Sequence, residues 1–231
     1  MPVYYDFTIP IHENMGGIPS GGKADAFSRP TVRLTHTIER EGWLAEEFTI
    51  TTHSGTHIDF PAHMLKGGET IDKFSLADFI GEGVVLNIPK AELEGITDVD
   101  LERAKPKVQE GDIVLINTGW WKKWEPFDKA MNDYVTWKHP GIVLSGAKWL
   151  AAKKIKAIGI DANAVHVQGK SNESDPRESV HHTFLSHRIP IIEGLTTLDE
   201  ASGKRGKIFI VPLPLKNAGG TLVRVFMESV K

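Results

Sequence analysis

The stretch Thr51–His63, which reads TTHSGTHIDFPAH, constrains this chain more than any other segment. It holds four candidate metal-binding side chains within thirteen positions: His53, His57, Asp59 and His63. Pro61 excludes a regular helix, because a proline inside a helix removes a hydrogen bond and clashes with the preceding turn. Neutral imidazole nitrogens and carboxylate oxygens are donors that divalent metals take in proteins. The stretch therefore predicts a metal-binding loop.

The four candidate side chains all occupy odd positions, so they share one face if extended backbone continues past Thr52. A straight strand would still separate His53 from Asp59 by about 20 Å at about 3.3 Å per residue. The backbone must therefore curl, and Gly55 permits this most readily. The three ligands His53, His57 and Asp59 would leave an open coordination position, as catalytic metals have. The alternative is a polar surface loop. That would explain a single histidine, but it is a poor explanation for four candidate ligands in one stretch.

Composition narrows the class of protein. The 231 residues predict one domain, 1–231, and 40% hydrophobic and 25% charged residues are typical of a globular protein. The net charge of −3, without a basic patch, argues against nucleic acid as a partner. Without cysteine, any metal must be held by nitrogen and oxygen donors. The first residues do not form a signal peptide and no apolar run would span a membrane, so we expect a cytoplasmic protein without a membrane partner.

The order of predicted elements indicates an α/β fold with parallel strand pairing. Thr97 or Asp98 is expected to cap the second helix and Ser145 the third. The glycine-rich loop 12–30 either covers a pocket or is a surface excursion. Strands are expected at 3–11, 31–38, 46–52, 84–88, 113–117, 157–160, 189–195, 208–213 and 221–227. Helices are expected at 69–80, 97–104, 145–155 and 179–187, and the first of them could instead be two short turns.

A second group of candidate ligands lies about 120 residues further along the chain, at His181, His182 and Glu193. Successive helical residues point about 100° apart, so only one of the two histidines is expected to face the site. Glu193 interrupts the apolar strand IPIIEGL, and a carboxylate buried there needs a strong partner. Two partners remain open: a metal, or an ion pair with an arginine or a lysine, for which Arg188 and Arg224 are available.

Other candidate residues have weaker signals. Asp161 follows a buried strand, where α/β sites gather, but a capping or turn role is favoured. His166 lines the pocket or lies on the surface. Four tryptophans favour a core or interface role over an aromatic wall for a planar substrate: Trp120, Trp121, Trp124 and Trp137.

The segment HSGTHIDFPAH resembles the signature HxGTHxDxPxH of the metal-dependent cyclase/hydrolase family, which includes bacterial kynurenine formamidases and isatin hydrolases. HHTFLSHRIPIIEGL looks like the second metal-binding segment of that family, and PLPLKNAGG like its C-terminal strand and turn. The resemblance covers essentially the whole chain. It implies a layered β/β/α swivelling domain with mixed sheets and peripheral helices, assembled as a homodimer or homotetramer.

Carried over to this sequence, the resemblance implies two divalent metals, zinc or manganese. His53, His57 and Asp59 would bind the first; Asp59, His181 and Glu193 would bind the second, with Glu193 as a possible bridge. The tryptophan that precedes the signature in kynurenine formamidases is missing here. Phe27 is the candidate replacement, and Trp120 is the other candidate for substrate binding.

The reaction expected from these ligands is hydrolysis of an amide, formamide or lactam of a small molecule. His63 is the expected general acid/base, since its reference pKa of about 6.5 suits protonation of a leaving nitrogen. The alternatives are a metal-dependent cyclase or dehydratase acting on a polyketide-like carbonyl, and a non-catalytic metal-binding protein.

Overall fold

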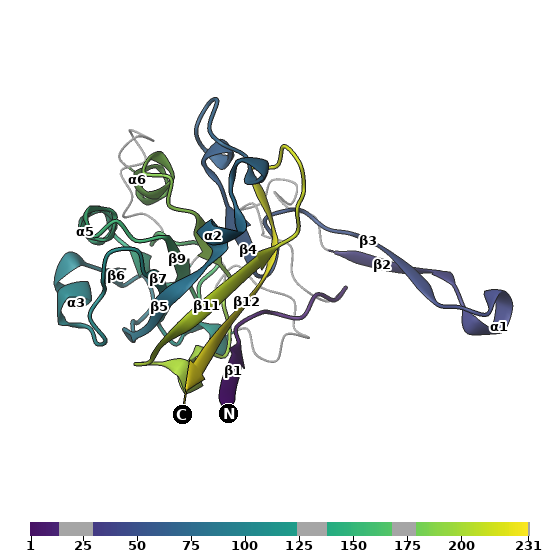
Figure 1. Cartoon of the computed structure of the whole chain (residues 1–231), viewed down its shortest axis with the longest axis horizontal. Coiled ribbons are helices and arrows are strands. Elements are labelled where there is room, and N and C mark those ends of the chain that lie inside the picture. The colour runs from purple at the N-terminus through teal and green to yellow at the C-terminus, as the bar shows by residue number, and fades with distance from the viewer. Residues whose placement is uncertain (14–29, 124–137, 168–178, 231) are drawn as a thin grey trace.

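One sheet provides the framework of the molecule, and it closes on itself (Figure 1). The computed structural model describes residues 1–13, 30–123, 138–167 and 179–230. The strands follow the order β1-β12-β11-β5-β7-β9-β10-β4, and β4 also pairs with β12, so that all of them except β1 form a closed barrel. The strands are β1 Pro2–Asp6, β4 His57–Asp59, β5 Ile80–Asn87, β7 Ile113–Asn117, β9 Ala157–Ile160, β10 Ile191–Glu193, β11 Arg205–Pro212 and β12 Gly220–Val230.

The parallel part of the barrel consists of β5, β7, β9 and β10. All five residues of β7 are buried, as expected for a strand with covered faces. Val114 and Ile116 belong to the core on the helical side, whereas Ile113 and Leu115 belong to the core that includes Ile58 and Ile210. These four positions are therefore all apolar because the two faces of the strand pack in two different cores.

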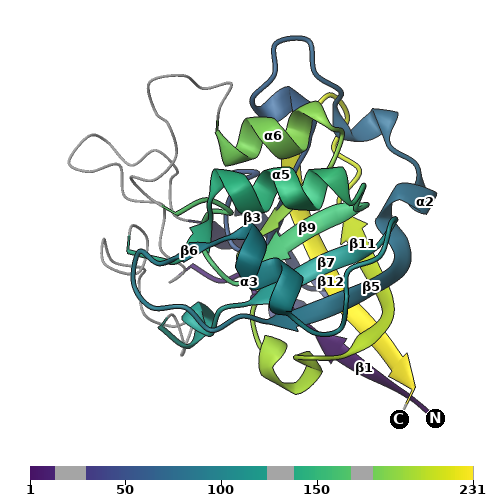
Figure 2. The ribbon, with the colours of Figure 1, turned by 90° about the vertical axis from the view of Figure 1, so that its left-hand side faces the viewer.

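The longer helices cover one side of the parallel strands, with α5 and α6 lying in front of β9 in Figure 2. None of the helices in the described ranges is long and apolar enough to cross a membrane. The helices are α1 Ile38–Glu41, α2 Leu76–Phe79, α3 Asp98–Arg103, α5 Leu144–Ala152 and α6 Val180–Ser186, with 3-10 turns η1 Pro61–His63, η2 Ile71–Lys73, η3 Trp120–Lys123 and η5 Leu198–Ala201.

The expected mixed α/β class is confirmed. The segment 69–80 forms two short turns, η2 and α2. Thr97 caps α3 by accepting a hydrogen bond from the Asp100 amide, as expected. The prediction that Ser145 caps the next helix is wrong: α5 begins at Leu144 with Val143 as its cap, and the Ser145 hydroxyl instead accepts a bond from the Asp98 amide at 3.4 Å. The layered swivelling arrangement stays a prediction.

Two further pairs of strands lie outside the barrel. β6 (Gly95–Ile96) and β8 (Gly141–Ile142) form a short parallel pair. β2 (Thr31–His36) and β3 (Ala45–Thr49) form an antiparallel ribbon that projects from the barrel with α1 at its tip (Figure 1). Strands are found in both predicted ranges, 31–38 and 46–52, but both end early: β2 ends at His36, with Ile38 already in α1, and β3 ends at Thr49. The connection includes Gly42 in the left-handed region at φ 80°.

Asp161 ties the end of β9 to the turn that follows β7. Its side chain is fully buried, and Oδ1 accepts hydrogen bonds from the Thr118 amide at 2.9 Å and the Thr118 hydroxyl at 2.7 Å. Burial raises the pKa of Asp161 to about 6, against the lowering effect of these hydrogen bonds. The favoured turn role of Asp161 agrees with these contacts.

The raised pKa of Asp161 predicts a component of stability that depends on pH. The folded chain binds this proton more tightly than the unfolded chain, so the component is present below about pH 4 and disappears as pH rises through about 6. The ordinary pKa is 3.8, and the difference corresponds to about 2–3 kcal/mol. Asp161→Asn retains an acceptor for Thr118 without the titration. Urea unfolding from pH 4 to 7 should show a smaller loss of stability in this variant; parallel pH profiles for the two proteins would contradict the assignment.

Candidate metal centre

The loop that carries the histidines turns sharply before it joins the barrel. Gly55 has a left-handed backbone conformation with φ 61°, which agrees with the expectation that the chain curls at this residue. The hydroxyls of Thr51 and Ser54 lie 2.6 Å apart across the turn. The Thr56 hydroxyl donates to the Gly194 carbonyl at 2.6 Å and accepts from the Ile9 amide at 2.9 Å. The chain therefore enters β4 in a position that buried hydrogen bonds determine.

Strand β4 places His57 and Asp59 between two neighbouring strands. His57 lies opposite Glu193 in β10 and opposite Leu222 in β12. The His57 Nδ1 is 3.0 Å from the Gly55 carbonyl, so a proton on Nδ1 can be donated to that oxygen and Nε2 is left free for the site. Barrel closure and ligand placement thus involve the same three residues of β4.

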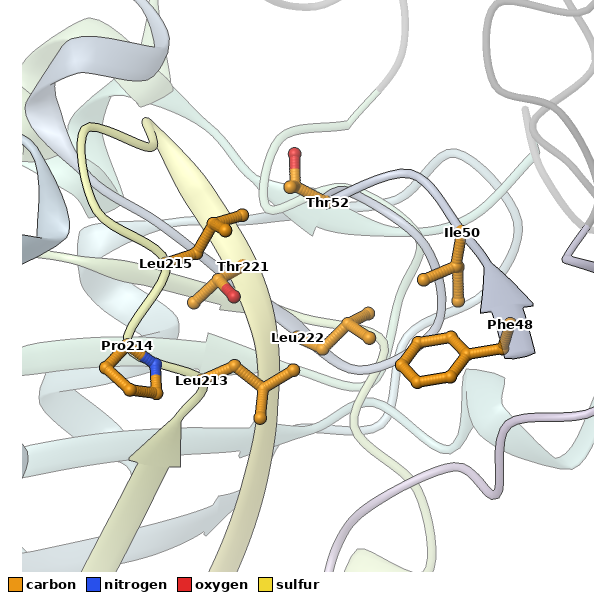
Figure 3. Close-up of a pocket in the computed structure, with 8 residues that line it drawn as sticks. All are labelled: Phe48, Ile50, Thr52, Leu213, Pro214, Leu215, Thr221 and Leu222. Atoms are coloured by element: carbon orange, nitrogen blue, oxygen red, sulfur yellow. The ribbon is translucent and has the colours of Figure 1, made fainter. Parts of the chain in front are cut away.

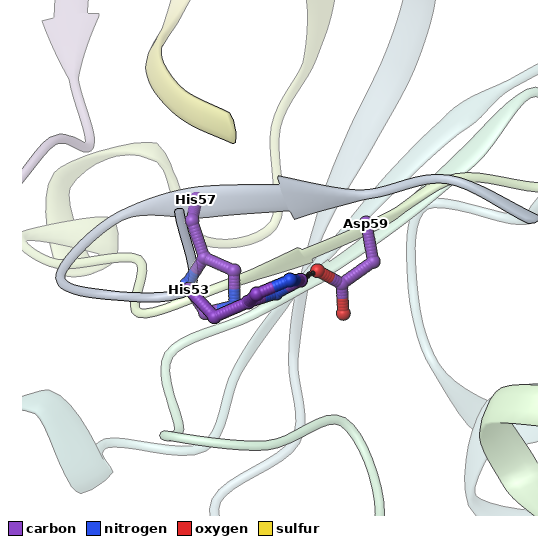
Figure 4. A group of neighbouring side chains, drawn as sticks. All are labelled: His53, His57 and Asp59. Atoms are coloured by element: carbon purple, nitrogen blue, oxygen red, sulfur yellow. Dashed lines mark ion pairs between the residues drawn. The ribbon is translucent and has the colours of Figure 1, made fainter. Parts of the chain in front are cut away.

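The first group of donors surrounds one oxygen of Asp59. His53 Nδ1 lies 2.7 Å and His57 Nε2 lies 3.7 Å from Asp59 Oδ1. Figure 4 shows the two rings and the carboxylate converging. One possible ligand atom from each residue lies within 4.8 Å of the other two. The predicted trio is therefore brought together in space.

The second group of donors surrounds the other oxygen of Asp59. His63 Nε2 and His181 Nε2 each lie 3.9 Å from Asp59 Oδ2. Glu193 joins the two groups, since its Oε1 is 3.1 Å from His181 Nε2 and its Oε2 is 3.4 Å from His57 Nε2. Four predicted histidines therefore gather around the two predicted carboxylates, which are both buried.

The partner of Glu193, which sequence left open, is not an arginine. Arg188 contacts Glu69 and Asp78. Arg224 contacts Asp6. The ion pair of Glu193 with Arg188 or Arg224 is therefore wrong. Glu193 is 5% exposed and contacts two histidines and the Val165 amide.

The donor set fits a divalent cation. Asp59 is 1% exposed, and although His53 Nδ1 lies 2.7 Å from Oδ1, neither carboxylate oxygen accepts a hydrogen bond of good geometry from the described residues. A buried carboxylate whose hydrogen bonds are not made is costly, and a cation would satisfy both oxygens. Imidazole and carboxylate are also the donors that zinc and manganese accept. We conclude that the residues present suit a metal at this position.

Electrostatics at the site reflect the two buried carboxylates. Burial lowers the pKa of His57, but the hydrogen bond to Glu193 and the charges of Asp59 and Glu193 outweigh it and raise the pKa to about 9. The pKa of His181 is also raised: burial opposes the shift, and the bond to Glu193 causes it. The pKa of Glu193 lies well below its usual value because both histidines outweigh the effect of burial. Protons on these histidines thus balance charge that a divalent cation would otherwise balance.

His63 differs from the other histidines in exposure. Its side chain is 28% exposed, against 4% for His57. Burial lowers the pKa of His63; Asp59 opposes this shift, and the neighbouring His53 and His181 add to it. His63 is therefore neutral near pH 7 and accessible to a molecule outside the cluster.

The remaining candidates have different positions. His181 is buried at 8% exposure and faces the cluster, in agreement with the expectation that one histidine of the pair does so. His166 lies beside it, with 3.3 Å between their Nδ1 atoms. Trp120 is 3% exposed and packs in the core on the helical side, in agreement with the core role favoured for it. Phe27, Trp124, Trp137 and most of the loop 12–30 lie outside the described residues.

Two glycines that support the histidines were not assigned a role from sequence. A Cβ on Gly220 would lie 2.4 Å from His53 Cε1, and a Cβ on Gly219 would lie 2.9 Å from the His63 amide nitrogen. The available signal is the glycine doublet at the end of PLPLKNAGG, whose second glycine is the first residue of β12. The absence of side chains there lets both histidines approach the strand.

The fold and the site define a closed α/β barrel with a buried histidine and carboxylate centre. Residues 5–167 match the family model described as "Putative cyclase". The chain belongs to this cyclase family of metal-dependent hydrolases.

Individual relatives agree with the family. A kynurenine formamidase of Erythrobacter litoralis is 30% identical over 189 residues, which cover 79% of this chain and 76% of the relative. A solved structure titled as a potential metal-dependent hydrolase with cyclase activity is 27% identical, with a TM-score of 0.76 and full coverage of both chains. Isatin hydrolase A of Labrenzia aggregata shares the fold, with a TM-score of 0.85, 19% identity, and coverage of 100% of this chain and 94% of that one.

Gly220→Ala should weaken metal binding without unfolding the protein. The new methyl group would overlap the His53 ring, which must move away from Asp59. We expect metal affinity, measured by calorimetric titration of the apoprotein, to fall by about 10–100-fold, the range seen when ligand orientation is disturbed.

Gly81→Ala is the matched control, because the nearest atoms to its Cβ would be the end of the long Lys156 side chain and none of the cluster residues. Equal metal affinity in the Gly220 variant and the wild type would show that His53 does not depend on this close approach.

Proposed function

We propose that this protein is a metal-dependent hydrolase that cleaves the C–N bond of an amide, formamide or lactam. The observation that carries the proposal is the buried Asp59 carboxylate, which lies between two sets of histidines and beside the partly exposed His63. A structural metal site would be closed by its protein ligands. Here one histidine of the cluster stays accessible, as a reaction with an external molecule requires.

The proposed ligands follow the two oxygens of Asp59. His53, His57 and Asp59 would hold the first metal. Asp59, His181 and Glu193 would hold the second, with Glu193 also able to reach the first through its position between the two histidines. We propose zinc or manganese, two ions per subunit, because both accept this mixture of imidazole and carboxylate.

When bound, the divalent metals would polarise a carbonyl and make a hydroxide nucleophile available near neutral pH. His63 Nε2 would take the proton that water loses on adding to the carbonyl carbon. The same nitrogen would then donate the proton to the leaving nitrogen as the C–N bond breaks. The lowered pKa of His63 supports this role, since a neutral imidazole is required to accept the first proton.

The proposed substrate class rests on the chemistry of the relatives. By their names, one relative is a formamidase and one structural neighbour hydrolyses isatin. Phe27 and Trp120 remain the proposed candidates for contact with substrate, although Trp120 is buried in the core. Both substrates present a carbonyl next to nitrogen, which is the group that this site would polarise.

We also propose the general setting of the protein. The chain would form one domain of the layered swivelling kind and assemble as a homodimer or homotetramer in the cytoplasm. Its substrate would be a small molecule, with neither nucleic acid nor membrane as a partner. The net charge of −3 supports the exclusion of nucleic acid.

A cyclase or dehydratase reaction is the second candidate function, and the matched family carries the cyclase name. The same ligands would then polarise a carbonyl toward its enol. Reaction of a panel of formamides, lactams and isatin in ¹⁸O-labelled water separates the two, because only hydrolysis places solvent oxygen in the product. An unlabelled cyclised product would contradict the hydrolase proposal.

His63→Ala should abolish turnover and leave metal content unchanged. The variant removes the proton carrier but none of the proposed ligands, so we expect a loss of kcat of about 100–10,000-fold. Elemental analysis and steady-state kinetics measure the two effects, and His187→Ala is a control at a histidine outside the cluster. Substantial remaining activity would show that another group moves the proton.

His181→Ala should remove one metal per subunit. The buried imidazole is the proposed ligand that connects Glu193 to the second metal. Its neighbour His182 occupies the same helix, and His182→Ala provides a matched control. We expect mass spectrometry under native conditions to find one ion in the first variant and two in the control. Two ions in both variants would exclude His181 as a ligand.

A further inference from the structure

His166 contacts the one ring nitrogen of His181 that does not face the two carboxylates. The Nε2 atom of His181 lies 3.1 Å from Glu193 Oε1 and 3.9 Å from Asp59 Oδ2. The Nδ1 atom of the same ring lies 3.3 Å from His166 Nδ1. The two rings meet edge to face, with an angle of 67° between their planes. His166 therefore lies behind a proposed metal ligand.

The residue before His166 contacts the other ligand that comes from the distant part of the chain. The Val165 amide donates a hydrogen bond of 2.7 Å to Glu193 Oε1, the same oxygen that lies beside His181 Nε2. Two successive residues, Val165 and His166, thus contact Glu193 and His181 respectively. Both contacts are made at atoms that leave His181 Nε2 and Glu193 Oε2 available to a cation.

The backbone of this dipeptide is fixed by its neighbours. Val165 is fully buried in the core on the helical side, and its carbonyl accepts a hydrogen bond from the Ile142 amide at 2.8 Å. His166 forms a parallel bridge with Ile142. A Cβ on Gly141 would overlap the His166 carbonyl group, so the adjacent chain packs directly on this backbone. The half-buried ring of His166 is therefore carried by a fixed part of the fold.

Metal binding by His181 would determine which way the hydrogen bond between the two rings runs. A neutral imidazole has one proton, so a ring that binds a metal through Nε2 carries its proton on Nδ1. The Nδ1–H of His181 would then donate to Nδ1 of His166. That nitrogen accepts only when the proton of His166 is on Nε2. A metal at His181 thus requires one particular tautomer of each ring.

We propose that His166 is a positioning residue for the second metal, because it accepts a hydrogen bond from His181 and so holds Nε2 of that ring toward Asp59 and Glu193. The role rests on the proposed two-metal centre, in which His181 is a ligand. A metal-binding histidine commonly donates its second ring N–H to a partner that orients the ring.

The first metal would have the same kind of support from the main chain. His57 Nδ1 lies 3.0 Å from the Gly55 carbonyl, which no substitution removes. His181 has a side chain as its partner instead. The affinity for the second metal is therefore expected to depend on the identity of residue 166, whereas the affinity for the first metal is not.

The apolar pocket of about 260 Å³ shown in Figure 3 adjoins the first group of donors. Thr52, which precedes His53, lines this pocket, and so does Leu222, which pairs with His57. His166 is not among its lining residues. A substitution at residue 166 is therefore expected to act on the centre through His181 and to leave this pocket unchanged.

Calorimetric titration of the full-length apoprotein with zinc tests the role of His166. We expect His166→Leu to bind the second ion about 10–100-fold more weakly and the first ion with unchanged affinity. His166→Asn places an amide oxygen close to the position of Nδ1 and should retain most of the affinity. His182→Leu removes a half-buried histidine of the same helix as His181 and is the matched control, with both affinities unchanged.

Two measurements keep the test decisive if His166→Leu does not fold, as circular dichroism would show. His166→Gln places its amide one bond further along the side chain, so it should bind the second ion more weakly than His166→Asn. In the zinc-loaded wild type, long-range ¹H–¹⁵N spectra of the histidine rings should find the proton of His166 on Nε2 and that of His181 on Nδ1.

The proposal is overturned by an unchanged second affinity in His166→Leu, by equal affinities in His166→Asn and His166→Gln, or by a proton on Nδ1 of His166 in the zinc-loaded protein. A wild type that binds a single ion would overturn it together with the two-metal centre. All these readouts are independent of turnover. An inactive wild type with two ions bound would therefore contradict only the proposed reaction.

Discussion

The pairing of β4 with both β10 and β12 is the interaction on which this structure depends. It closes the barrel, it holds the ring of His57 against Glu193, and it fixes Asp59 two residues further along the same strand. β4 is only three residues long, so hydrogen bonds from both sides must compensate for its length. The hydroxyl of Thr56 and the left-handed Gly55 contribute further by directing the chain into the strand. Stability of the barrel and geometry of the site therefore both depend on β4.

Local spacing explains what the sequence predicted well. His53, His57, Asp59 and His63 fall within one short stretch, and the curl at Gly55 follows from the length of an extended chain. Thr97 was a correct cap because its capping box is contained within four residues. Glu193 was correctly recognised as needing a partner, since a buried carboxylate cannot remain alone. Which partner it takes depends on a strand more than 130 residues away, so sequence left it open.

Other features needed the tertiary structure. Val32, Leu34 and Phe48 alternate as the residues of a core strand would, and the pattern does not show that their ribbon projects from the barrel. Closure through β4 and β12 was equally hidden, because a three-residue strand has no periodicity to detect. Ser145 carries a good capping side chain, but the helix begins one residue before it and its hydroxyl meets α3.

The division of the centre into a local and a distant half has a consequence for the unfolded chain. His53, His57 and Asp59 remain within seven residues of one another after unfolding, so a cation can still bind them there. Binding to the unfolded state subtracts from any stabilisation of the native state. His181 and Glu193 approach Asp59 only in the folded barrel. An ion held by these residues therefore discriminates between the two states far more strongly than one held by the local trio.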